Sequence, residues 1–106
     1  MKKYFIVFII FLTGLIAAGC ETEITKFCRI IYEGNGGTSE NRPVDNNNYT
    51  PGSKAKVLSN TYERTGYIFE HWNTHWENTG DSYEPDDELV ITDQNFIHLY
   101  AIWKTE

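Results

Sequence analysis

The chain has 106 residues and a formal net charge of −6 at pH 7, with 41% hydrophobic and 15% aromatic residues. This length gives room for one small domain at most. A chain with this much negative charge repels the phosphate backbones of nucleic acids, and no basic stripe offsets the repulsion. Nucleic acid is therefore not an expected partner. Two cysteines are too few for a disulfide scaffold.

Residues 1–20, MKKYFIVFIIFLTGLIAAGC, have the pattern of an export signal. Two lysines come before an apolar run from Tyr4 to Leu15, and small residues close the segment. The run is shorter than the roughly 20 apolar residues that a membrane-spanning helix needs. The pattern therefore predicts an export signal, with an uncleaved membrane anchor as the alternative.

The end of this segment, IAAGC, resembles a bacterial lipobox, with Ala17 at the place of the usual leucine. The resemblance implies a lipoprotein in which residues 1–19 are a signal peptide that is removed, and Cys20 carries acyl chains such as palmitate. Loss of two lysines leaves seven Lys and Arg against 15 Asp and Glu, so the net charge becomes −8. We expect the protein in the bacterial cell envelope, held by its lipid at the outer membrane or cell surface.

Residues 20–26 are polar and read as a tether, so the domain is expected over residues 27–106. No stretch of it has a sustained 3.6-residue apolar period, and short alternation between turn signals is typical of a mainly β domain. Cys28, Ile30 and Tyr32 alternate along a first strand that ends at GNGG. On that apolar face Cys28 is expected to be buried and inert, with pairing between molecules as the alternative.

Further strands are expected after the polar segment TSENRPVDNNNYT, in which Val44 and Tyr49 are the substantial apolar residues. The turn dipeptide Pro51-Gly52 precedes the next alternating run. Alternation and turn signals place these strands at about 54–59, 67–73, 88–91 and 97–103.

Five segments follow one another in the order and spacing of a known repeat: IIYEGNGG (30–37), YTPGSKAKV (49–57), RTGYIFEHWNT (64–74), TGDSYEPDDELVI (79–91) and HLYAIW (98–103). They resemble a single InlB B-repeat, also called the Listeria–Bacteroides repeat, of bacterial surface proteins. The resemblance implies a small β-grasp-like (ubiquitin-like) domain with a curved mixed sheet, little helix and no characterised catalytic site. Two family glycines are replaced, one by His71 and one within SYEPDDE, where Asp86 and Asp87 stand.

The sequence HWNTH places His71 and His75 at the spacing of metal ligands on one face of a helix. Along a strand the same spacing separates them by about 13 Å, so only a turn could join them at one metal. His98 has the opposite parity from the core residues of the last strand. The sequence DSYEPDDE lacks the alternating carboxylates and glycine bend of a calcium loop. Solvated side chains are therefore favoured over a metal site, and no cofactor is expected.

No G-x-S-x-G motif and no phosphate-binding loop is present in the sequence, and about 80 residues of β structure leave little room for a catalytic pocket. We therefore do not expect an enzyme.

Alternation and position in the family pattern place four aromatic residues in the core: Tyr32, Phe69, Trp72 and Trp103. Trp76 follows the family's W-N-T in a loop and has no evident core role. With Tyr83 and His75 nearby, Trp76 would form an exposed platform for a sugar or a protein partner. The other reading, which the residues alone favour, is a tryptophan that covers the edge of the small core.

Together these features favour a non-enzymatic, lipid-anchored binding or adhesion module that contacts a host or envelope protein or glycan. A structural spacer of the envelope without a specific ligand is the alternative. Because a lone repeat cannot form a long stalk, the sequence favours interaction.

Overall fold

A computed structural model describes residues 26–106; the expected signal peptide, Cys20 and the start of the tether lie outside the described residues. Residues 26–106 form six strands and no helix: β2 (Arg29–Glu33), β3 (Lys54–Lys56), β4 (Tyr67–Asn73), β5 (Ser82–Tyr83), β6 (Glu88–Val90) and β7 (Phe96–Thr105). Over this range no helix has the length and apolar character needed to cross a membrane.

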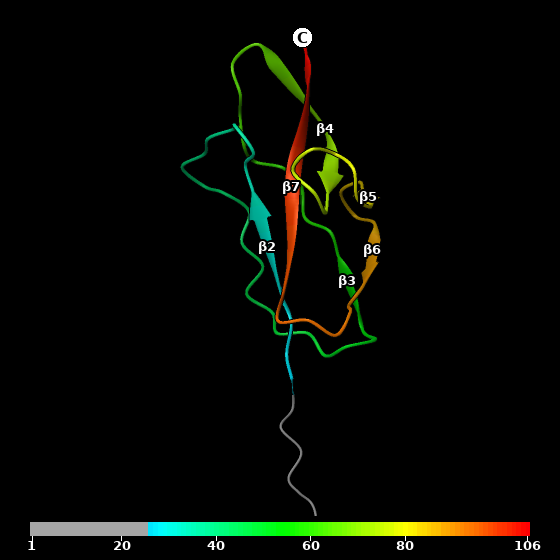
Figure 1. Ribbon diagram of the computed structural model, residues 1–106. Coiled ribbons are helices and arrows are strands. Elements are labelled where there is room, and N and C mark those ends of the chain that lie inside the picture. The colour runs from blue at the N-terminus through cyan, green and yellow to red at the C-terminus, as the bar shows by residue number, and fades with distance from the viewer. Residues whose placement is uncertain (1–25) are drawn as a thin grey trace, which may run out of the picture.

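The strands form a mixed four-stranded sheet in the order β2-β7-β4-β5 and a separate antiparallel pair of β3 and β6 (Figure 1). β2 runs parallel to β7, with Arg29 opposite Phe96 and Glu33 opposite Tyr100. β4 runs antiparallel to β7 on the other side. The expected mainly β class with a mixed sheet is confirmed, and the parallel pairing of the first and last strands fits a β-grasp-like arrangement.

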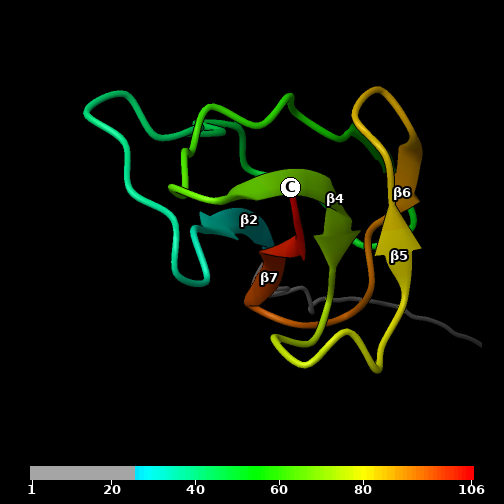
Figure 2. The same cartoon turned by 90° about the horizontal axis from the view of Figure 1, so that it is seen from above.

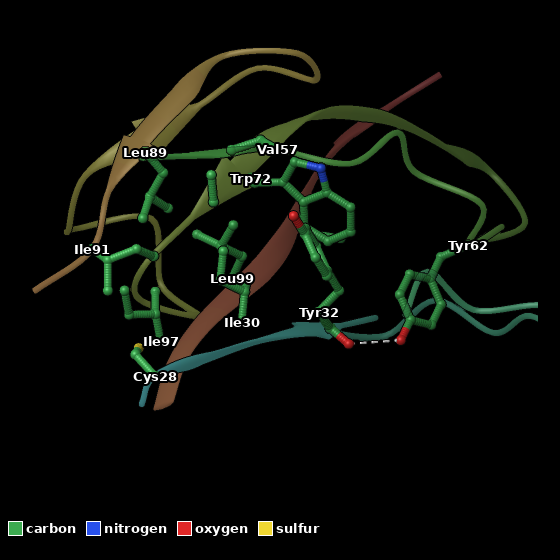
Figure 3. Packing of buried hydrophobic residues seen from close by; sticks show 12 residues of the cluster. Cys28, Ile30, Tyr32, Val57, Tyr62, Trp72, Leu89, Ile91, Ile97 and Leu99 are labelled. Carbon is green, nitrogen blue, oxygen red and sulfur yellow. Dashed lines mark hydrogen bonds between the residues drawn. The ribbon is translucent and has the colours of Figure 1, made fainter. Parts of the chain in front are cut away.

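The core lies between the two sheets and is filled by alternating side chains (Figure 3). The large sheet contributes Ile30, Tyr32, Trp72, Ile97, Leu99 and Ala101, and the small sheet with its flanking residues contributes Ala55, Val57, Leu89 and Ile91. Cys28 is fully buried in the same cluster, as its alternation predicts. Burial raises the pKa of the Cys28 thiol, which disfavours the reactive thiolate.

Trp72 is the largest fully buried side chain and lies at the centre of the aromatic part of this core. Its ring centroid is 4.9 Å from that of Tyr32 and 5.1 Å from that of Phe69, both in edge-to-face geometry. The indole N–H donates to the Leu58 carbonyl at 2.9 Å, so its polar atom is satisfied. Tyr32 and Trp72 are buried as predicted, whereas Phe69 and Trp103 are half-buried and pack against the cluster.

A β-bulge at Glu70 allows Phe69 and Trp72 to share the core face of β4. In a regular strand two residues three positions apart face opposite sides of the sheet. Here the register with β7 shifts between Phe69 and His71, so Phe69 lies opposite Trp103 while Trp72 lies opposite Ala101. The extra residue in β4 is Glu70, as in other bulges where two residues oppose one.

The segment before β3 is anchored differently from the prediction. Val44 is 55% exposed, and Asp45 beside it is buried instead. The Asp45 carboxylate accepts hydrogen bonds from the Tyr49 hydroxyl at 2.7 Å and from the Asn47 backbone N–H at 2.9 Å. Tyr49 does pack against the core. A hydrogen-bonded aspartate therefore holds this segment together with Tyr49, in place of Val44.

Strand boundaries differ from the predicted ranges mainly in the short elements. β3 ends at Lys56 rather than near residue 59, and β6 ends one residue earlier than expected. The two-residue β5 was not predicted, because only its pairing with Trp72 and Asn73 of β4 makes it a strand. A run of two residues has no periodicity that a sequence could reveal.

The buried phenol of Tyr32 makes the fold sensitive to alkali. Its oxygen accepts a hydrogen bond from the Leu58 backbone N–H at 2.9 Å, and its side chain is among the core residues. Burial raises the pKa of Tyr32 to about 12. Burial also raises the pKa values of Tyr49, Tyr62 and Tyr83.

We predict that the free energy of unfolding falls between pH 10 and pH 12. Below pH 10 the phenol of Tyr32 is protonated in both the folded and the unfolded state. Above pH 10 the unfolded chain loses this proton first, which stabilises the unfolded state relative to the folded state by about 2–3 kcal/mol at pH 12. Urea unfolding at pH 8, 10 and 11.5 measures this loss. Tyr32→Phe should reduce the slope of the free energy of unfolding against pH by the equivalent of about one proton. An unchanged slope would contradict the attribution of this loss to Tyr32.

Candidate functional site

The loop that joins β4 to β5 presents Trp76 at the corner of a tight turn. The Asn78 N–H donates to the His75 carbonyl at 2.9 Å, and Asn78 has a left-handed φ of +66°. The Thr74 N–H donates to the Asp81 carbonyl at 3.0 Å and closes the base of the loop. The segment HWNTH thus passes from strand into turn and is not helical, so its i, i+4 spacing does not bring the two imidazoles onto a helix face.

Asn73 fixes this loop from below. Its side chain is fully buried, and its carbonyl oxygen Oδ1 accepts from the N–H groups of His75 at 2.8 Å and Gly80 at 2.9 Å. Its Nδ2 donates to the Gly80 carbonyl at 3.2 Å and to Ser82 Oγ at 3.0 Å. The Asn73 amide therefore binds both ends of the loop. The sequence did not predict this role, although Asn73 is the asparagine of the family's W-N-T motif.

Asn35 ties the same loop to the centre of the sheet. It stands in the turn after β2 with a left-handed φ of +49°. Its Nδ2 donates to the Trp76 carbonyl and to the Ala101 carbonyl, both at 2.9 Å. Figure 2 shows the loop on the side of β7 away from the segment that follows β3, so it covers the face opposite the core.

The turn after β2 also holds Trp103 in place. The Trp103 indole N–H donates to the Gly34 carbonyl at 2.9 Å. A Cβ at Gly37 would lie 2.5 Å from the Trp103 ring, so only glycine fits against it. Trp103 therefore forms a fixed wall beside the Trp76 loop.

Between these elements lies a groove of about 570 Å³, which we call the Trp76 groove. Its lining residues are Asn35, Gly36, Arg64, Glu70, Trp76, Glu77, Asn78, Ile102 and Trp103. The indole of Trp76 is stacked on His75, with ring centroids 5.7 Å apart and 21° between planes. Trp76 is nonetheless 55% exposed, so most of the ring remains available for contact.

The predicted platform residues are only partly brought together. His75 and Trp76 stack as described, and the Nδ1 of His75 accepts the Glu77 N–H at 3.0 Å. Tyr83 lies in β5 opposite Trp72, is half-buried and packs against the core. Tyr83 therefore belongs to the opposite face of the sheet and is not part of the groove lining.

The remaining histidines have separate partners. His71 Nε2 is 2.8 Å from Asn78 Oδ1 and thus links β4 to the Trp76 loop. His98 is exposed on β7, as its parity predicts, and its Nδ1 is 3.1 Å from Glu33 Oε2. Within residues 26–106, no three His, Cys, Asp or Glu side chains gather as a possible metal-binding group.

The acidic turn after β5 is a hydrogen-bonded turn. Asp87 Oδ2 accepts the Glu84 N–H at 2.7 Å. Asp86, at a position where the family pattern has glycine, adopts a left-handed φ of +76°. An aspartate tolerates this conformation better than most residues, so the replacement keeps the turn.

A family model described as the Listeria-Bacteroides repeat domain matches residues 29–102. The match begins at the first residue of β2 and ends within β7, so it covers most of the sheet, the core and the Trp76 groove. Cys28 of the core and Trp103 of the groove lie just outside it. No curated protein and no solved structure matches the chain.

We predict that Asn35→Gly loosens the Trp76 loop without unfolding the domain. Glycine keeps the left-handed backbone of position 35 but removes both side-chain hydrogen bonds, which is expected to cost about 1–3 kcal/mol. Hydrogen exchange of the backbone amides of residues 75–80 should become faster. Exchange in β2 should change less, and equal acceleration of both segments would contradict a local role of Asn35.

Proposed function

Since the chain belongs to the Listeria-Bacteroides repeat family, we propose that it is a non-enzymatic binding or adhesion module that contacts a protein or glycan partner through the Trp76 groove. Family membership identifies a surface-associated repeat domain and supports a location in the cell envelope. The observation that carries the proposal is an exposed tryptophan on a fixed turn.

Exposure distinguishes Trp76 from the other two tryptophans. Trp72 is fully buried, and Trp103 is half-buried with its indole N–H bound to a carbonyl. Trp76 keeps 55% of its surface exposed. A tryptophan that served only to cover the core would bury its ring, whereas contact residues at interfaces are enriched in exposed aromatic side chains.

Rigidity of the loop supports the same proposal. Asn35 and Asn73 hold the Trp76 loop by hydrogen bonds at its carbonyl and at both of its ends. A loop whose backbone is already held in one place loses little conformational entropy when it binds. The loop therefore presents the indole in a defined position, because the conformational entropy of the loop is already lost when the domain folds.

Attachment to the membrane is a separate part of the proposal. The sequence IAAGC supports acylation of Cys20 and removal of residues 1–19. Between Cys20 and Lys26 the chain can extend about 20 Å. A lipid at Cys20 would thus hold the domain close to a membrane while its groove remains accessible.

We predict that Trp76→Ala weakens partner binding at least tenfold and changes the free energy of unfolding by less than about 1 kcal/mol. Binding of the labelled full chain to arrays of purified envelope proteins and bacterial and host glycans measures the first effect, and thermal unfolding measures the second. Phe96→Ala is the matched control, because Phe96 is an aromatic residue of β7 with 52% exposure that lies outside the groove.

Two results would favour the purely structural alternative. The first is a loss of stability in Trp76→Ala, which would mean that the ring covers the core. The second is that no component of the arrays binds the native chain.

We predict that Cys20→Ala releases the protein from membranes. The substitution removes the thiol that would carry the lipid. Fractionation of the producing cells, with antibody labelling of intact cells, should show native protein in the membrane fraction and at the surface. The variant should appear in soluble fractions, and equal membrane retention of both would support an uncleaved anchor instead.

A further inference from the structure

Two carboxylates line the Trp76 groove without a cationic partner. Glu77 follows Trp76 in the tight turn, and Glu70 enters the groove from the bulge of β4. Both residues are exposed. Across residues 26–106 the ion pairs are Lys26–Asp93, Lys54–Glu88 and His98–Glu33. Glu70 and Glu77 take part in none of them.

Arg64 is the one cation of the groove lining, and it is engaged elsewhere. Its guanidinium carbon lies 3.8 Å from the centroid of the Tyr67 ring, in a cation–π contact. Its side chain also lies beside Gly36, where a Cβ would come within 3.1 Å of the guanidinium carbon. Arg64 therefore forms part of the wall and makes no ion pair with either carboxylate, so the two glutamates leave the groove lining with a net negative charge.

The domain as a whole also carries a net negative charge. Residues 26–106 carry seven Lys and Arg against 13 Asp and Glu, which gives a formal charge of −6. Such a surface raises the local concentration of cations and steers positively charged partners towards it.

We infer that the Trp76 groove receives a lysine or arginine side chain of a basic peptide segment, with the cation on the Trp76 indole and beside the carboxylates of Glu70 and Glu77. Tryptophan is the side chain that binds cations best through its ring face. Carboxylates form the stronger, charge-assisted hydrogen bonds to ammonium and guanidinium groups. The inference rests on the proposed function, because it names the chemistry of the partner that the same groove binds.

Indole N–H signals of the ¹⁵N-labelled full chain, in micelles of an uncharged polyoxyethylene detergent, test the inference. The three tryptophans give three such signals. Trp72 donates to Leu58 in the closed core and serves as an internal reference. Tetralysine, tetraglutamine and cellotetraose are added separately at equal concentrations. Tetralysine should shift the Trp76 signal saturably, with the other two probes at least tenfold weaker, and 0.3 M NaCl should weaken its binding severalfold.

Paired charge variants separate the groove from the general field of the domain. Glu70→Gln with Glu77→Gln should weaken tetralysine binding at least tenfold. Glu40→Gln with Glu84→Gln removes the same charge from exposed positions outside the groove and should change it less than twofold.

Several results would overturn the inference. Equal weakening by both double variants would mean nonspecific attraction, and a stronger response to tetraglutamine or cellotetraose would mean a neutral ligand. No response to any probe would also overturn it. In each case the proposed function is judged independently, by the array binding and thermal unfolding of Trp76→Ala. It fails if the variant binds the array components as tightly as the native chain, if the variant loses stability, or if no component binds the native chain.

Discussion

The bulge in β4 is the constraint on which both the core and the groove depend. Because Phe69 and Trp72 are three residues apart, one extra residue is needed before both can face the core. With that residue in place, the edges of Phe69 and Tyr32 meet the Trp72 ring. The extra residue is Glu70, whose side chain lines the groove. The same backbone irregularity thus completes an aromatic core and adds a charge to the other side of the sheet.

Two asparagines connect that sheet to the Trp76 loop. Asn73 is buried at the end of β4 with its amide satisfied by four groups, three of which belong to the loop itself. Asn35 bonds the carbonyls of Trp76 and Ala101 from the turn after β2. A short amide side chain offers both donors and an acceptor, so it can replace the backbone pairing that an irregular loop lacks. These hydrogen bonds hold the loop in place although it has no ladder of its own.

The sequence alone predicted those parts of the structure that follow from periodicity and motif. Alternation located β2 and β7 and buried Cys28 and Tyr32, because each strand has one face on the core. It could not locate β5, whose two residues become a strand only by pairing with β4. Of the predicted platform, the stacked pair of His75 and Trp76 formed, but parity alone could not show that Tyr83 faces the core. Asn73 was missed because polarity suggests exposure, while its burial depends on partners from both ends of a loop.

The parallel pairing of β2 with β7 also determines how the domain would carry a load. β2 begins at the end of the sheet where the described chain starts, and β7 ends at the opposite end (Figure 1). A pull between these two points acts along the strands, so the bonds between β2 and β7 are sheared together and are not opened one after another. Five opposed residue pairs would have to slip at once. A force applied between the two ends of the described domain would thus load the β2–β7 pair in shear.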